Sequence, residues 1–162
     1  MGAPHMSGEA LSVALEREHL QIDAGIRAFL AGLEGDRVDA AGLSATLAGL
    51  RRHIYLEEQL LFPPISSGAD MMAVLGMIRG HGEIWRTMNA LDDLARAGAD
   101  HDRLRWTCRQ LLALLADHNK VEEPVLYPAA DTGLAPEQAA EVAEFLAAGQ
   151  MPEGWTCARG AV

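Results

Sequence analysis

The sequence predicts an all-α protein, an up-down-up-down four-helix bundle with a short C-terminal fifth helix. Apolar residues recur at spacings of three and four in segment after segment, and strand-like alternation is weak. The segments between the apolar stripes are short, which favours antiparallel neighbouring helices. A chain of 162 residues is also the usual size of a single domain with one core.

Each of the four long helices carries its own apolar stripe, and these stripes lie within residues 11–30, 43–61, 74–94 and 104–125. Pro63-Pro64 and Pro128 are expected to end the second and fourth helices, because proline lacks the N–H that a helix interior needs. A short fifth helix is expected to open at Pro136 and to close at Gly149.

The division of the chain follows from these elements. Residues 1–6, Met-Gly-Ala-Pro-His-Met, resemble a cloning remnant. Residues 7–130 should form the bundle, and residues 131–162 a short helix and tail packed on or beside it. No leader peptide or membrane-spanning apolar run is evident, so we expect a cytoplasmic protein.

Charge and cysteine content exclude several function classes. A net charge of −10 and a pI near 4.9 oppose binding to nucleic acids and to anionic membranes. Cys108 and Cys157 lack the spacing of a redox or metal motif, which suits a reducing compartment and argues against a catalytic cysteine.

An internal repeat is the most informative feature. Residues 53–63 and 118–128 both follow the pattern H-x-x-x-E-E-x-x-L-[FY]-P. A histidine and a glutamate four residues apart lie on the same face of a helix, so His53 with Glu57, and His118 with Glu122, can each hold one ion. The repeat predicts two helical hairpins related by a pseudo-twofold axis.

The odd helices supply matching histidines. His19 and His81 each lie within an apolar stripe, at about the same height in the bundle as His53 and His118. A single inward histidine is usually a hydrogen-bonded core residue. Four imidazoles and two carboxylates buried in one layer without a cation would cost several kcal/mol for each unpaired charge, so the set predicts a metal site. His101 lies off this layer and is expected to be an exposed turn residue.

The ligand types favour iron or manganese over a structural zinc site, because imidazoles and carboxylates occur without a thiolate. Two ions are expected, because Glu57 and Glu122 come from different helices and can each bridge two cations. Two octahedral ions offer roughly twelve positions, of which four imidazoles, two bridging carboxylates and one shared oxygen would fill about ten. About two positions remain open for small ligands.

With this ligand order, the sequence resembles the hemerythrin-like, or HHE, family from about Glu9 to Pro128. The resemblance implies a bridged di-iron centre and chemistry with dioxygen or related molecules. It assigns the metal-ligand role to the six motif residues, which are His19, His53, Glu57, His81, His118 and Glu122.

One expected ligand of the family is missing. Oxygen-carrying hemerythrins have another histidine one turn from the third one, where this chain has Met77 and Trp85. Tyr55 is the favoured replacement, although only a helix bulge would turn it towards the site. Glu58 could also direct a carboxylate towards the site, although a solvated or outer role is favoured for it. We interpret Tyr127 as the closing aromatic of the repeat, equivalent to Phe62.

The function expected from these features is redox chemistry on small oxidants such as hydrogen peroxide, nitric oxide or dioxygen, with peroxidase- or catalase-like activity favoured over oxygen transport. A phenolate or extra carboxylate ligand would stabilise ferric iron and so oppose the diferrous form that oxygen carriage needs. A module that binds dioxygen reversibly, or that senses oxygen or iron, is the alternative. A purely structural metal site is a third possibility.

Overall fold

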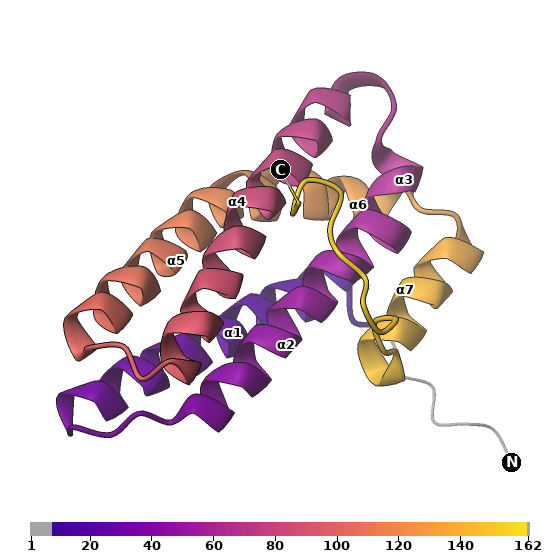
Figure 1. Cartoon of the computed structure of the whole chain (residues 1–162). Coiled ribbons are helices and arrows are strands. Elements are labelled where there is room, and N and C mark those ends of the chain that lie inside the picture. The colour runs from indigo at the N-terminus through magenta and orange to yellow at the C-terminus, as the bar shows by residue number, and fades with distance from the viewer. Residues whose placement is uncertain (1–7, 162) are drawn as a thin grey trace, which may run out of the picture.

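The computed structural model describes residues 8–161, and the predicted cloning remnant lies outside this range. The described chain is helical and forms a bundle with a short C-terminal helix, which confirms the predicted fold class (Figure 1). Four long helices form the bundle. They are α1 (Leu11–Glu34), α2 (Ala40–Leu56), α4 (Met71–Arg96) and α5 (His101–Val121).

Two of these helices run on through their prolines. A wide, π-helical turn, η1 (Glu57–Leu61), joins α2 to α3 (Phe62–Ile65). A second wide turn of the same kind, η3 (Glu122–Leu126), joins α5 to α6 (Tyr127–Gly133). The prediction that Pro128 ends a helix was therefore wrong, because α6 runs on to Gly133, whereas the helix containing Pro63-Pro64 ends one residue later, at Ile65. All three prolines stand in the first turn of a new α-helical segment, where a missing N–H costs little.

Short connections make neighbouring helices antiparallel. Residues 35–39 join α1 to α2, and residues 97–100 join α4 to α5. Asp39 and Asp100 cap the helices that follow by accepting hydrogen bonds from the backbone N–H groups of Gly42 and Arg103, at 3.0 and 2.9 Å. A 3₁₀ turn, η2 (Gly68–Asp70), precedes α4. None of the helices in residues 8–161 is both long and apolar enough to cross a lipid bilayer.

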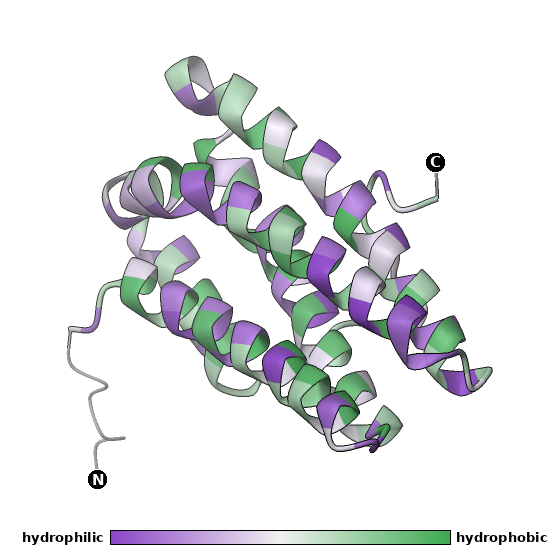
Figure 2. Cartoon of the chain, turned by 90° about the vertical axis from the view of Figure 1, so that its left-hand side faces the viewer, coloured by the Kyte–Doolittle hydropathy of each residue, from purple (hydrophilic) through white to green (hydrophobic). Residues whose placement is uncertain are grey.

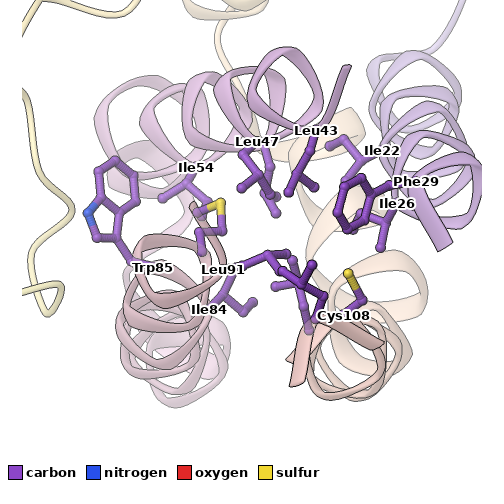
Figure 3. Close-up of a cluster of buried hydrophobic side chains, with 14 of the residues drawn as sticks. Ile22, Ile26, Phe29, Leu43, Leu47, Ile54, Ile84, Trp85, Leu91 and Cys108 are labelled. Carbon is purple, nitrogen blue, oxygen red and sulfur yellow. The ribbon is translucent and has the colours of Figure 1, made fainter. Parts of the chain in front are cut away.

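Two hydrophobic clusters fill the bundle, one on each side of the histidine layer. Figure 3 shows the cluster near the α1–α2 and α4–α5 loops, which includes Ile22, Ile54 and Ile84 and which we call the loop-end core. The other, the proline-end core, includes Leu15 and Met77. Polar residues alternate with these apolar faces around each long helix (Figure 2). The histidine layer therefore lies between two apolar regions.

The fifth helix, α7 (Pro136–Ala148), has the predicted bounds, with Gly149 at its C-terminal cap. The guanidinium of Arg52 in α2 donates hydrogen bonds to the carbonyls of Gly149 and Leu146, at 2.8 and 3.2 Å. Figure 1 shows the C-terminal segment running back from α7 towards α4. There Arg86 donates a hydrogen bond of 2.7 Å to the carbonyl of Arg159.

Candidate metal centre

The six histidines and glutamates predicted as ligands lie together in the interior. Their side-chain nitrogen and oxygen atoms form two groups of four, with all atoms of a group within 4.8 Å of one another. The first group contains His19 and His53, the second contains His81 and His118, and Glu57 and Glu122 belong to both. All six residues are buried. The His101 side chain is only half-buried and lies at the start of α5, 3.5 Å from Asp36.

Each glutamate directs one oxygen to each group. Glu57 Oε2 is 3.4 Å from His53 Nε2, and Glu57 Oε1 is 3.1 Å from His81 Nε2. Glu122 Oε1 is 3.0 Å from His19 Nε2, and Glu122 Oε2 is 2.9 Å from His118 Nε2. An octahedral ion with bonds of about 2.1 Å holds adjacent ligand atoms about 3 Å apart. The donor set therefore fits two cations bridged by two carboxylates.

Tyr127 joins the first group through its hydroxyl oxygen. This oxygen is 2.7 Å from Glu57 Oε2, 2.8 Å from Glu122 Oε1, 2.8 Å from His19 Nε2 and 3.1 Å from His53 Nε2. The side chain is completely buried. Its oxygen is thus a fifth donor at the same spacing as the other four.

The wide turn η3 explains why Tyr127 lies on the ligand face. On a regular α-helix a residue five positions after Glu122 would be rotated by about 140° from it. Here the N–H of Tyr127 bonds to the carbonyl of Glu122, so that one wider turn spans the five residues and returns to the same face. Pro124 lies inside this turn and cannot donate the hydrogen bond that a regular helix requires. Pro124 is the sequence signal that could have indicated the bulge.

Tyr55, the phenol proposed from the sequence, is not brought to the cluster. Its ring packs against Phe145 of α7 and edge-on against Trp155 of the C-terminal segment, with ring centroids 5.4 and 5.0 Å away. The helix is widened after Glu57, beyond Tyr55, so the bulge does not rotate Tyr55 inward. The structure therefore replaces Tyr55 with Tyr127 as the candidate phenol ligand.

The second group differs from the first because its equivalent aromatic residue has no hydroxyl. Phe62 follows η1 as Tyr127 follows η3, and its ring stacks on His81 with centroids 5.8 Å apart. The four predicted donors of the second group therefore have no counterpart of the Tyr127 oxygen. One aromatic difference in the repeat therefore makes the two groups of donors chemically different.

Outer carboxylates orient three of the four histidines. The Nδ1 atoms of His19, His53 and His81 lie 2.9, 2.8 and 2.7 Å from carboxylate oxygens of Glu123, Glu18 and Glu58 respectively. An Nδ1–H donated to a carboxylate leaves Nε2 free to bind a cation and makes it a stronger donor. Glu58 thus lies on the outer side of His81, the role favoured for it from the sequence.

Within residues 8–161, His118 has no such partner, and its buried Nδ1 makes no hydrogen bond. The pseudo-twofold repeat explains this difference. Glu18 precedes His19 in α1 and reaches His53, whereas Gly80 precedes His81 in α4. Glycine supplies no carboxylate at this position, and a Cβ atom at Gly80 would lie only 3.2 Å from His118 Nδ1.

Loss of an outer carboxylate is expected to weaken metal binding. The substitution Glu58→Ala removes the acceptor of the His81 Nδ1–H, and such changes reduce metal affinity about 10- to 100-fold. Competition with a chelator would measure the affinity, and Glu83→Ala, on the exposed face of α4, is the control. Equal affinities for the two variants would contradict the orienting role of Glu58.

The buried groups shift one another's pKa values. Burial raises the pKa of Glu57, but the charges and hydrogen bonds of His53 and His81 outweigh it and keep that pKa well below its usual value. Burial lowers the pKa of His81, but hydrogen bonds to Glu57 and Glu58 outweigh it and raise that pKa to about 9. Burial and the carboxylates of Glu122 and Glu57 raise the pKa of Tyr127 well above its usual value. A protonated His81 imidazole is thus favoured beside the Glu57 carboxylate in metal-free protein.

Metal-free protein should consequently become less stable at alkaline pH. The stabilisation linked to His81 is complete below its ordinary pKa of 6.5 and is lost as the pH rises through about 9, a decrease of at most about 3 kcal/mol. The stabilisation linked to Glu57 is present above 4.5 and is lost as the pH falls through its lowered pKa. Urea unfolding in a chelator should show highest stability between pH 4.5 and 6.5. Unchanged stability up to about pH 10 would contradict this linkage.

Comparison with known families agrees with this geometry. Residues 13–130 match the model of the hemerythrin HHE cation-binding domain, and this segment contains Tyr127 as well as the six histidines and glutamates. Searches of curated proteins and of solved structures find no match to the chain. Because the matched segment covers well over half of the sequence, the chain belongs to the hemerythrin HHE cation-binding domain family.

Proposed function

We propose that this protein holds two iron ions and uses them in redox chemistry on small oxidants, with peroxide reduction or dismutation as the principal activity. The observation that carries the proposal is the Tyr127 hydroxyl among the donors of the first group. Imidazole, carboxylate and phenol donors without thiolate suit iron. When bound, two iron ions would supply the electron transfer that cleaves a peroxide O–O bond.

The protein's residues would divide the work between the two positions. His19, His53 and Tyr127, together with the shared carboxylates of Glu57 and Glu122, offer five donors to one cation. His81 and His118 with the same carboxylates offer four donors to the other. The second position therefore retains about two of six octahedral sites, which favours it as the place where a small substrate binds.

Tyr127 also distinguishes redox turnover from oxygen transport. A cation stabilises the phenolate form of a tyrosine, and an anionic oxygen ligand in turn favours ferric over ferrous iron. Trp85, at a position where oxygen carriers have their further histidine, is buried in the loop-end core with its ring edge-on to Trp155 at 5.5 Å. The phenol would thus favour a ferric resting state, and Trp85 would leave out a ligand that oxygen carriers have. Both features weigh against reversible dioxygen binding.

Peroxide consumption by iron-loaded protein tests the proposal. The rate should exceed that of the same concentration of free iron, and Glu122→Gln, which alters a carboxylate shared by both groups, should abolish the excess. Consumption of nitric oxide and of dioxygen would be measured on the same samples. Consumption no faster than free iron, or a reduced protein that binds and releases dioxygen unchanged, would overturn the proposal.

A further inference from the structure

A cavity of about 290 Å³ adjoins the ligand cluster on the side of the loop-end core. The four histidines and two glutamates of the cluster line one part of it. The rest of its interior wall is mostly aliphatic, with Asn119 and Glu123 as its polar members. The aliphatic wall residues are Ile22, Leu50, Ile54, Ile84, Leu112 and Leu115. The cavity is thus a mainly apolar space with the candidate metal positions on one wall.

The cavity reaches the surface between α1 and α5. Leu20 on α1 borders it and is 71% exposed, and Ala116 on α5 borders it from the opposite side. Asp23 and Arg27 also border it, and they form an exposed ion pair of 2.7 Å with each other. A molecule could therefore enter from solvent between these two helices and arrive beside the cluster without crossing the proline-end core.

The size of the cavity exceeds what a small inorganic oxidant requires. A water molecule occupies about 30 Å³ in the liquid, and hydrogen peroxide, nitric oxide and dioxygen need little more. An apolar cavity of about 150 Å³ already binds benzene. At about 290 Å³, this cavity approaches the lower end of the range for small organic ligands.

We propose that the cavity binds the hydrocarbon group of an organic hydroperoxide, ROOH, and that the protein prefers such substrates to hydrogen peroxide. The substrate class rests on the peroxide chemistry proposed above, whereas binding of the hydrocarbon group does not. The aliphatic walls would bury R, and the cluster on the adjoining wall would receive the peroxide oxygens. Hydrogen peroxide has no group that could use these walls.

The reaction is a two-electron reduction in which the O–O bond breaks. ROOH, two protons and two electrons give ROH and water. The electrons come from two equivalents of an external one-electron donor of the ascorbate or phenol class, which is oxidised. The alcohol ROH keeps the hydrocarbon group, so it should occupy the same cavity as the substrate. It is therefore a probe of binding that undergoes no turnover.

Calorimetric titration of the iron-loaded protein of 162 residues with 2-phenyl-2-propanol, the alcohol from cumene hydroperoxide, tests the site without any catalysis. Leu112→Phe, which adds bulk to a cavity wall, should weaken this binding by about tenfold or more. Leu114→Phe is the matched control, because Leu114 is also half-buried on α5 but does not line the cavity. Leu115→Phe repeats the test at another wall residue in case Leu112→Phe does not fold.

Kinetics with two peroxides complete the experiment. Wild-type kcat/KM for cumene hydroperoxide should exceed that for hydrogen peroxide by about tenfold or more, and Leu112→Phe should remove this preference. Leu114→Phe should keep it. A wild-type protein that binds no alcohol, or a Leu112→Phe variant that slows both peroxides equally, would overturn the inference.

The two proposals fail in different ways. Alcohol binding that is weakened by Leu112→Phe, with no consumption of either peroxide above free iron, would overturn the proposed peroxidase function and the hydroperoxide assignment while leaving the apolar binding site in place. Consumption of hydrogen peroxide without alcohol binding would support the proposed function and contradict the cavity's role.

Discussion

Replacing Glu122 with glutamine should weaken binding of both metal ions by more than about 100-fold, the largest effect expected from any single substitution. Glu122 is completely buried and directs one oxygen to each group of donors. The amide keeps the volume of the side chain but removes a negative charge that the two proposed cations would share. Metal content after dialysis, measured by elemental analysis, should fall to near zero.

The neighbouring residue provides the control for this change. Glu123 hydrogen-bonds to His19 Nδ1 on the outer side of the ring and belongs to neither donor group. Glu123→Gln should therefore retain both ions, with a smaller loss of affinity. Equal metal content in the two variants would contradict the assignment of Glu122 as the bridging carboxylate.

Replacing Tyr127 with phenylalanine should remove the visible absorption band expected of a phenolate bound to ferric iron. Tyr127 is the phenol whose oxygen lies among the donors, at 2.7 to 3.1 Å from four of them. The change should also lower the free energy of unfolding of metal-free protein by about 1–3 kcal/mol, because buried carboxylates lose a hydrogen-bond donor. Optical spectra and urea unfolding measure the two effects.

Tyr55→Phe is the matched control for this prediction. The Tyr55 ring packs against Phe145 and Trp155, so removal of its hydroxyl should leave the visible band unchanged. Loss of the band in Tyr55→Phe but not in Tyr127→Phe would contradict the structural assignment and restore the ligand originally favoured from the sequence.

Periodicity alone predicted most of the fold and the residues that the structure brings together. Histidine and glutamate four residues apart share a face on any regular helix, and the pattern repeats in two helices, so Glu57 and Glu122 could be placed without coordinates. The bounds of α7 followed from another local signal, because proline favours the first turn of a helix and glycine its C-terminal end.

The remaining features depend on departures from a regular helix and on contacts distant in sequence. A wide turn changes the face of every residue that follows it, so regular periodicity could not place Tyr127 among the donors. The contact between the Ala158 N–H and Glu58, at 2.9 Å, joins residues 100 positions apart. The unpartnered Nδ1 of His118 depends on the approach of Gly80 from another helix.

Iron analysis combined with Mössbauer spectroscopy of the iron-loaded protein tests the central claim most directly. The account predicts two iron ions per chain in two different environments of equal population, because the Tyr127 oxygen adjoins one donor group and the Phe62 ring adjoins the other. A protein that binds no iron or a single zinc ion, or two irons in identical environments, would contradict it.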